Sequence, residues 1–238
     1  MALPLAFASA VGSASGDRPR IVAFASGKGG AGKSLTAANV GIFLATLGKR
    51  VVLVDAALGT PTLHLYAGVP RPSRTLGELL RRGGPRLAEL SVPTTVPGLR
   101  LVGAAADPES SAAPSAANVA TLTAELRQLP ADWVVVDLSS GLHPTTIELL
   151  LAADIRVLLA TPEPSSIELM HRLVRATFLA HARAHGLEAM LDAVPREQRA
   201  HESGMTSALE AYETAVAGGA PPRPGRGQSP CPTWTAPR

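Results

Sequence analysis

The sequence has little cysteine, few aromatic residues and no long apolar run. Cys231 is its single cysteine, which excludes an intramolecular disulfide and a multi-cysteine metal or iron–sulfur site within one chain. Because no run of ~18 uninterrupted apolar residues occurs, no membrane-spanning helix is expected. Aromatic residues make up only 3% of the 238 residues, but 46% are hydrophobic, which is enough for a folded core and excludes global disorder.

The net charge of +3 arises at one end of the chain. Residues 218–238 contain three arginines and no acid, so the other 217 residues balance at 19 basic and 19 acidic side chains. This balance gives no support to a uniformly basic nucleic-acid surface. The same end is rich in proline and glycine, and we expect a disordered tail over 218–238. Residues 1–19 carry no basic residue before Arg18, which favours a flexible extension over a secretory signal. We therefore expect a cytoplasmic protein whose folded domain spans 20–217.

Short apolar segments alternate with helical segments from residue 20 to about residue 185. The predicted strands are Ile21–Ser26, Val51–Asp55, Leu99–Gly103, Trp133–Asp137 and Ile155–Thr161. The predicted helices are Ser34–Leu47, Thr75–Arg82, Ser115–Leu129, Thr145–Ala152 and Ser165–Ala184. This order predicts an α/β fold with a mostly parallel sheet and helices on both faces. Beyond residue 185 the sequence offers helix formers at 188–194 and 206–216 but no convincing strand.

A glycine-rich segment joins the first predicted strand to the first predicted helix. Residues 21–34 read IVAFASGKGGAGKS and satisfy the pattern G-x-x-x-x-G-K-[ST]. Glycines let successive backbone N–H groups point at anionic oxygens, and the following helix adds its positive end. The alternative, a plain glycine-rich turn, rarely matches this pattern at a strand–helix junction. We therefore predict a nucleotide site formed by Gly27, Lys28, Gly29, Gly30, Ala31, Gly32, Lys33, Ser34 and Leu35.

Two side chains of this segment have expected roles in chemistry. Lys33 is placed to reach the β- and γ-phosphates of a nucleotide, and the Ser34 hydroxyl to ligate magnesium. A second lysine, Lys28, follows Gly27 directly, and the sequence KGGAGKS resembles the deviant Walker A loop of the ParA/MinD family of P-loop ATPases. The resemblance, which covers residues 20–180, implies ATP and Mg²⁺ as cofactors and an ATP-dependent homodimer. It also implies that Lys28 and Lys33 are catalytic, with Lys28 entering the other subunit's site; the alternative for Lys28 is a solvated loop lysine.

The second predicted strand carries a variant of a family motif. Residues 51–64 read VVLVDAALGTPTLH and are similar to the first switch region, in the version found in flagellar-number regulators of the FlhG type. Asp55 matches the first aspartate of the motif, which the resemblance places near magnesium. Ala57 stands where the family has the aspartate that orients the attacking water, and Thr62 replaces an asparagine. Because alanine cannot orient water, the resemblance predicts weak or absent hydrolysis.

Two later segments complete the resemblance. WVVVDLSSGL at 133–142 matches the Walker B strand and second switch. Asp137 is therefore the predicted magnesium partner, with a strand-end cap as the alternative, and Gly141 the glycine whose N–H meets a γ-phosphate. TPEPSSI at 161–167 is similar to the segment that opens a long helix in the family. The further strands that the family has are not found in the sequence after residue 185. Two explanations stay open: the C-terminal region is truncated, or it has diverged from the family pattern.

These residues favour an ATP-binding dimerisation switch in cellular positioning, including flagellar placement, that acts on an unidentified protein partner. No basic amphipathic helix for membrane targeting is found, because Met205–Val216 carries two glutamates and no basic residue. One alternative is a degenerate protein that folds without binding nucleotide. Another is an ATP-dependent, carboxylate-activating enzyme of the dethiobiotin-synthetase type, which Lys28 and the TPEP segment disfavour.

Overall fold

The structure is a computed structural model, and it describes residues 18–57, 61–81, 83–104 and 115–187. The chain divides into two compact units, 1–181 and 182–238, of which the second is described only over 182–187. The predictions for residues 1–17, for the helix formers at 188–194 and 206–216 and for the tail at 218–238 lie outside the described residues. Arg18, near the end of the expected extension, forms an ion pair with Asp154 at 3.0 Å. No helix in the described ranges combines the length and apolarity needed to cross a membrane.

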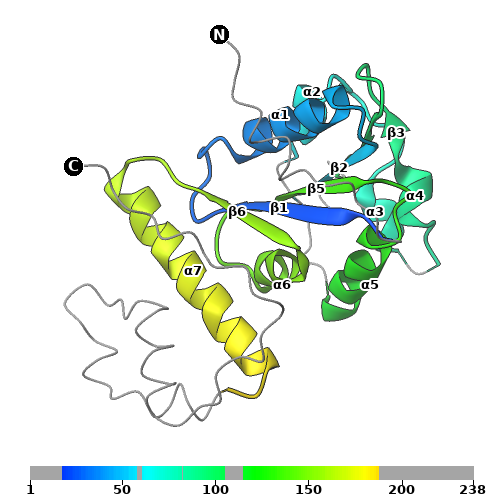
Figure 1. Ribbon diagram of the computed structural model, residues 1–238. Helices are drawn as coiled ribbons and strands as arrows, with labels where there is room; N and C mark the ends of the chain where they lie inside the picture. The colour runs from blue at the N-terminus through cyan, green and yellow to red at the C-terminus, as the bar shows by residue number, and fades with distance from the viewer. Residues whose placement is uncertain (1–17, 58–60, 82, 105–114, 188–238) are drawn as a thin grey trace, which may run out of the picture. The chain divides into compact units, whose positions relative to one another are not determined.

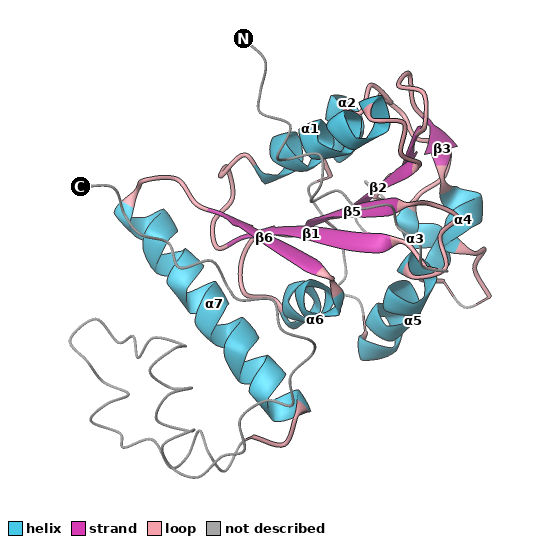
Figure 2. Ribbon diagram, viewed as in Figure 1, coloured by secondary structure: helices cyan, strands magenta, loops and turns pink. Residues whose placement is uncertain are grey.

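The described strands form one six-stranded sheet in the order β3-β4-β2-β5-β1-β6 (Figure 2). Its strands are β1 (Arg20–Ser26), β2 (Val51–Ala56), β3 (Val92–Pro93), β4 (Leu99–Val102), β5 (Trp133–Leu138) and β6 (Ile155–Leu159). Every pairing is parallel except that of β3 with β4. The expected mostly parallel sheet is confirmed, and β3 is the one described strand that the sequence did not predict.

Helices cover both faces of the sheet, as expected (Figure 1). They are α1 (Lys33–Thr46), α2 (Leu63–Tyr66), α3 (Leu76–Leu79), α4 (Leu87–Leu90), α5 (Ala116–Leu126), α6 (Pro144–Ala152) and α7 (Pro164–Ala184). Helices α1 and α2 lie on one face, and α5 and α6 on the other. The helix predicted over 75–82 is shorter than expected: a capping box of Thr75 and Glu78 begins it, and it ends before the glycine pair at 83–84.

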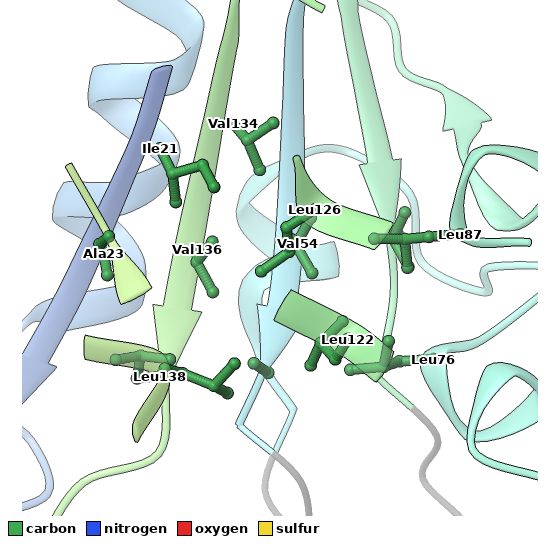
Figure 3. Close-up of a cluster of buried hydrophobic side chains, with 14 of the residues drawn as sticks. Ile21, Ala23, Val54, Leu76, Leu87, Leu122, Leu126, Val134, Val136 and Leu138 are labelled. Carbon is green, nitrogen blue, oxygen red and sulfur yellow. The ribbon is translucent and has the colours of Figure 1, made fainter. Parts of the chain in front are cut away.

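Alternating side chains of the central strands form two apolar layers. Ile21 and Ala23 of β1 face the layer that includes α5 and α6, whereas Val22 and Phe24 face the layer that includes α1. Figure 3 shows side chains of the first layer, in which Leu122 and Leu126 of α5 are drawn close to Val54 of β2. Burial on both faces explains why these strands read as continuous apolar runs in the sequence.

The parallel strands β1, β2 and β5 end at the same edge of the sheet. In the register of β2 with β5, Asp55 lies directly opposite Asp137. Phe24, two residues before the end of β1, is the partner of Asp137 on the other side. The fold therefore brings the glycine-rich loop after β1 together with the aspartates of β2 and β5, at the edge where open α/β sheets bind their ligands.

Candidate nucleotide site

The loop between β1 and α1 has the backbone conformation that its glycines permit. Gly30 and Gly32 have φ values of 83° and 80°, in the left-handed region that other residues rarely adopt. Gly32 is the N-cap of α1 and supplies no side-chain cap, so the first helical bond runs from the Thr36 N–H to the Gly32 carbonyl at 2.9 Å. The first turn of α1 also contains no acidic residue. Its N–H groups and the positive end of the helix dipole therefore remain suited to an anionic ligand.

Gly27 marks a close contact between this loop and α7. A Cβ atom at Gly27 would lie 2.3 Å from the carbonyl carbon of Leu169 and 2.4 Å from its oxygen. Both atoms belong to the backbone of a helix and have little freedom to move aside. Gly27 is thus required by packing, and the start of the glycine-rich loop lies directly against α7.

Replacing Gly27 with alanine tests this contact. We expect Gly27→Ala to destabilise the fold by about 2 kcal/mol or more, the cost of forced overpacking, and to lower the melting temperature by roughly 4–8 °C. Gly29→Ala is the matched control, because a Cβ there would meet only the Ser140 hydroxyl at an ordinary 3.7 Å. Thermal unfolding followed by circular dichroism measures both variants. Equal melting temperatures for the two would show that the loop and α7 are not pressed together.

The predicted phosphate lysine forms a buried ion pair with the predicted magnesium partner. Lys33 Nζ lies 2.5 Å from Asp137 Oδ1, and the two side chains are 9% and 0% exposed. The other carboxylate oxygen, Asp137 Oδ2, is buried, and it has no hydrogen-bond partner within the described part of the chain. An unpaired buried oxygen is costly unless a ligand satisfies it. Asp137 therefore offers one oxygen to Lys33 and a second one to a ligand.

Asp55 has a different environment from Asp137. Its Oδ1 accepts a hydrogen bond from the Ala57 N–H at 3.0 Å, and its Oδ2 one from the Leu63 N–H at 3.2 Å. These bonds tie both ends of the loop after β2 to the end of that strand. Burial, together with the neighbouring negative charge of Asp137, raises the pKa of Asp55 to about 7. The charged carboxylate is thus unfavourable without a nearby cation, and a bound divalent ion would relieve this.

Ala57 and Thr62, the two positions at which the resemblance implies other residues, lie beside these groups. Ala57 is buried, follows β2 directly and has no side chain that could position a water molecule. The Thr62 hydroxyl donates a hydrogen bond to Ser34 Oγ at 3.1 Å. The hydroxyl of Ser34, the predicted magnesium ligand, therefore lies beside a second hydroxyl that comes from the loop after β2.

Two other predicted residues have partners within their own chain. The Gly141 N–H, expected to meet a phosphate, donates to the Ser26 carbonyl at 2.9 Å, so it holds the loop after β5 against the end of β1. Lys28 Nζ donates to Glu163 Oε2 at 2.7 Å and to Ser165 Oγ at 3.1 Å. The sequence did not predict these two acceptors as site residues, although they belong to the TPEP segment that it singled out. Of the remaining loop positions, Leu35 is 49% exposed on the first turn of α1.

These residues fit a nucleotide with magnesium. The amides at the start of α1 and the Lys33 ammonium suit phosphate oxygens. Ser34 Oγ and Asp137 Oδ2, which no group in the described ranges hydrogen-bonds, are the hard oxygen donors that Mg²⁺ prefers. Asp55 adds negative charge nearby, but its two oxygens already accept backbone N–H groups. Among the predicted magnesium residues, Ser34 and Asp137 are thus better placed than Asp55.

Comparison with known proteins agrees with this geometry. The family model described as the CobQ/CobB/MinD/ParA nucleotide binding domain matches residues 22–218. The chain belongs to this family. The septum site-determining protein MinD of Synechocystis is 32% identical to this MinD/ParA-family chain over 156 residues, which are 65% of the chain and 58% of MinD. The flagellum site-determining protein YlxH of Helicobacter pylori is 33% identical over 152 residues, 62% of the chain and 50% of YlxH.

Solved structures show the same likeness. The MinD of Pyrococcus horikoshii, solved as a complex with Mg-ADP, is 25% identical to the present chain and superposes on it with a TM-score of 0.61. The match covers 68% of the present chain and 66% of the Pyrococcus MinD. The expected P-loop fold of the ParA/MinD type is thereby confirmed. This MinD/ParA-family chain spans between half and six-tenths of the length of the two curated relatives.

Proposed function

We propose that this chain binds ATP with Mg²⁺ and acts as a nucleotide-dependent dimerisation switch in cellular positioning. The observation that carries the proposal is the buried Lys33–Asp137 pair near the carboxyl end of β5, whose second carboxylate oxygen has no hydrogen-bond partner among the described residues. A buried ion pair with an unsatisfied oxygen is costly, and a bound phosphate and cation at the uncapped helix start would offset that cost. The pair thus argues against the degenerate alternative.

The process in which the switch acts is proposed from its relatives. One curated relative determines the septum site and another the flagellum site, according to their names. We propose that this chain likewise marks a position in the cell by presenting a surface to a protein partner when ATP is bound. The FlhG-like form of the segment at 51–64 favours flagellar placement within this class.

The switch needs a dimeric state that is stable with ATP bound and unstable without nucleotide. A ligand shifts such an equilibrium only through contacts that differ between the two states. Lys33 and the amides at the start of α1 bind the phosphates within one chain, whereas Lys28, one residue after the packed Gly27, is the lysine that the family resemblance assigns to the other subunit. We propose that this contact across the interface makes the dimer depend on the γ-phosphate.

The oligomeric state tests the proposal. We expect light scattering coupled to size exclusion to detect a monomer without nucleotide and a dimer with ATP and Mg²⁺, and we expect Lys28→Ala to remain monomeric. Because Lys28 is 41% exposed, its loss should change the stability of the monomer little. Lys49→Ala is the control for removing an accessible lysine elsewhere. A wild-type monomer under saturating ATP and Mg²⁺ would remove the switch.

A further inference from the structure

The Lys28 side chain forms hydrogen bonds within its own subunit to the segment 161–167. Its ammonium donates to Glu163 Oε2 at 2.7 Å and to Ser165 Oγ at 3.1 Å, more than 130 positions away in the chain. Two of the three ammonium hydrogens therefore have acceptors within the same chain. We refer to this arrangement as the Lys28–Glu163–Ser165 contact.

The acceptors of this contact lie on a rigid turn. Glu163 stands between Pro162 and Pro164, which restrict the backbone on both sides. The Glu163 carbonyl accepts the N–H groups of Ser166 and Ile167, both at 3.0 Å, at the start of α7. The buried Ser166 hydroxyl in turn accepts the Thr161 N–H at 3.0 Å. Glu163 and Ser165 are thus presented in a fixed place rather than on a free loop.

The donor is fixed as well, at its backbone. Gly27, the neighbour of Lys28, packs against the Leu169 backbone so tightly that no Cβ fits between them. The main chain beside Lys28 therefore lies directly against α7, and we expect its ammonium to change partners by a rotation of the side chain. When the Lys28 ammonium leaves Glu163 for another anion, the ion pair between them is lost. Each subunit whose Lys28 changes partner loses one such ion pair.

We propose that Glu163 and Ser165 are positioning residues that hold Lys28 in its own subunit and so oppose dimerisation until a nucleotide phosphate of the other subunit competes for it. The proposal deepens the function proposed above and rests on it. The phosphate succeeds because it carries more negative charge than the single Glu163 carboxylate. The contact thereby sets how much ATP the dimer needs.

The expected size of the effect follows from the exposure of the pair. Lys28 and Glu163 are 41% and 57% exposed, and ion pairs this accessible change an equilibrium constant by about 1.4- to 5-fold. A symmetric dimer breaks two such contacts, so the two factors multiply. Glu163→Gln, which removes the charge and keeps the shape, should tighten the ATP-bound dimer by about 2- to 30-fold.

The chain offers a direct readout of the contact, because it contains only three lysines, Lys28, Lys33 and Lys49. Acetylation by an amine-reactive ester, quantified by mass spectrometry, therefore reports Lys28 against Lys49 as a reference within the same molecule. In the nucleotide-free wild type the Lys28 ammonium is held by two acceptors and should react slowly. We expect the Lys28-to-Lys49 ratio to rise about 1.4- to 5-fold in Glu163→Gln, and to rise also in Ser165→Ala.

Glu168→Gln is the matched control. It removes the same charge from the start of α7, but Glu168 pairs with Arg172 on that helix instead of with Lys28. We expect it to leave both the labelling ratio and the dimer constant unchanged. Because Glu163 is exposed, its variant should fold normally, and circular dichroism verifies this for every variant.

The two measurements separate this proposal from the switch on which it rests. An unchanged labelling ratio in Glu163→Gln overturns the contact, even if the wild type dimerises with ATP. A raised ratio with an unchanged dimer constant, in a wild type that dimerises, overturns the opposition to dimerisation. A raised ratio in a wild type that never dimerises overturns the proposed switch and, with it, any effect of the contact on assembly.

Discussion

We expect ATP and Mg²⁺ to stabilise the wild-type protein against heat, and we expect replacement of Lys33 with alanine to abolish that stabilisation. At a nucleotide concentration of 100 Kd, binding stabilises the native state by about 2.7 kcal/mol, which corresponds to roughly 5–10 °C for a domain of this size. Lys33→Ala removes the ammonium that we expect to bind the phosphates. It also leaves Asp137 buried and unpaired, so the nucleotide-free variant should itself lose about 3–5 kcal/mol of stability. Differential scanning fluorimetry with and without ATP and Mg²⁺ measures both effects.

A second variant separates lost binding from lost stability. In Lys33→Met/Asp137→Asn neither buried charge remains, so most of the lost stability should return while the nucleotide-dependent shift stays absent. Lys49→Ala, which removes a lysine outside the loop, should behave as the wild type in both respects. A wild-type protein whose melting temperature does not respond to ATP and Mg²⁺ would favour the degenerate alternative, in which the fold is kept and binding is lost.

The parts of the site that follow one another in the sequence could be predicted from it. The pattern from Gly27 to Ser34 specifies a strand, a glycine-rich turn and a helix, and Gly30 and Gly32 adopt the conformations that only glycine takes readily. The aspartates at 55 and 137 each lie at or near the end of an apolar strand. Parallel strands end at a common edge, so their proximity follows from the fold once the sheet is known.

Contacts between distant segments could not be predicted in the same way. No local pattern shows that Glu163 accepts a hydrogen bond from Lys28 or that α7 leaves no room for a Cβ at Gly27, because both depend on how the helix after β6 packs. The two bonds from the Asp55 carboxylate to backbone N–H groups likewise depend on the path of the following loop. The short elements α2, α4 and β3 span two to four residues, too few for a hydrophobic period to indicate them.

Ala57, at the position where the family resemblance implies an aspartate, leads to the second large effect. We expect the wild-type protein to release phosphate from ATP at a rate barely above background, because the buried Ala57 side chain can neither accept a proton nor orient water. Ala57→Asp places a carboxylate directly after β2, on the residue whose N–H already bonds Asp55 at 3.0 Å. A positioned group of this kind contributes about 100-fold or more, so phosphate release should rise by about two orders of magnitude. A coupled phosphate-release assay with saturating ATP and Mg²⁺ measures the rate.

The same substitution should reduce the stability of the nucleotide-free protein. The pKa of Asp55 is already raised to about 7 by burial and by Asp137, and a third carboxylate beside them adds further repulsion. ATP with Mg²⁺ should restore more stability to Ala57→Asp than to the wild type, because the bound cation offsets this charge. Ala57→Asn, of equal size and without a charge, is the control and should hydrolyse ATP as slowly as the wild type. Brisk turnover by the wild type, or a folded and ATP-binding Ala57→Asp without faster release, would mean that another residue orients the water and that Ala57 does not occupy the position of the missing aspartate.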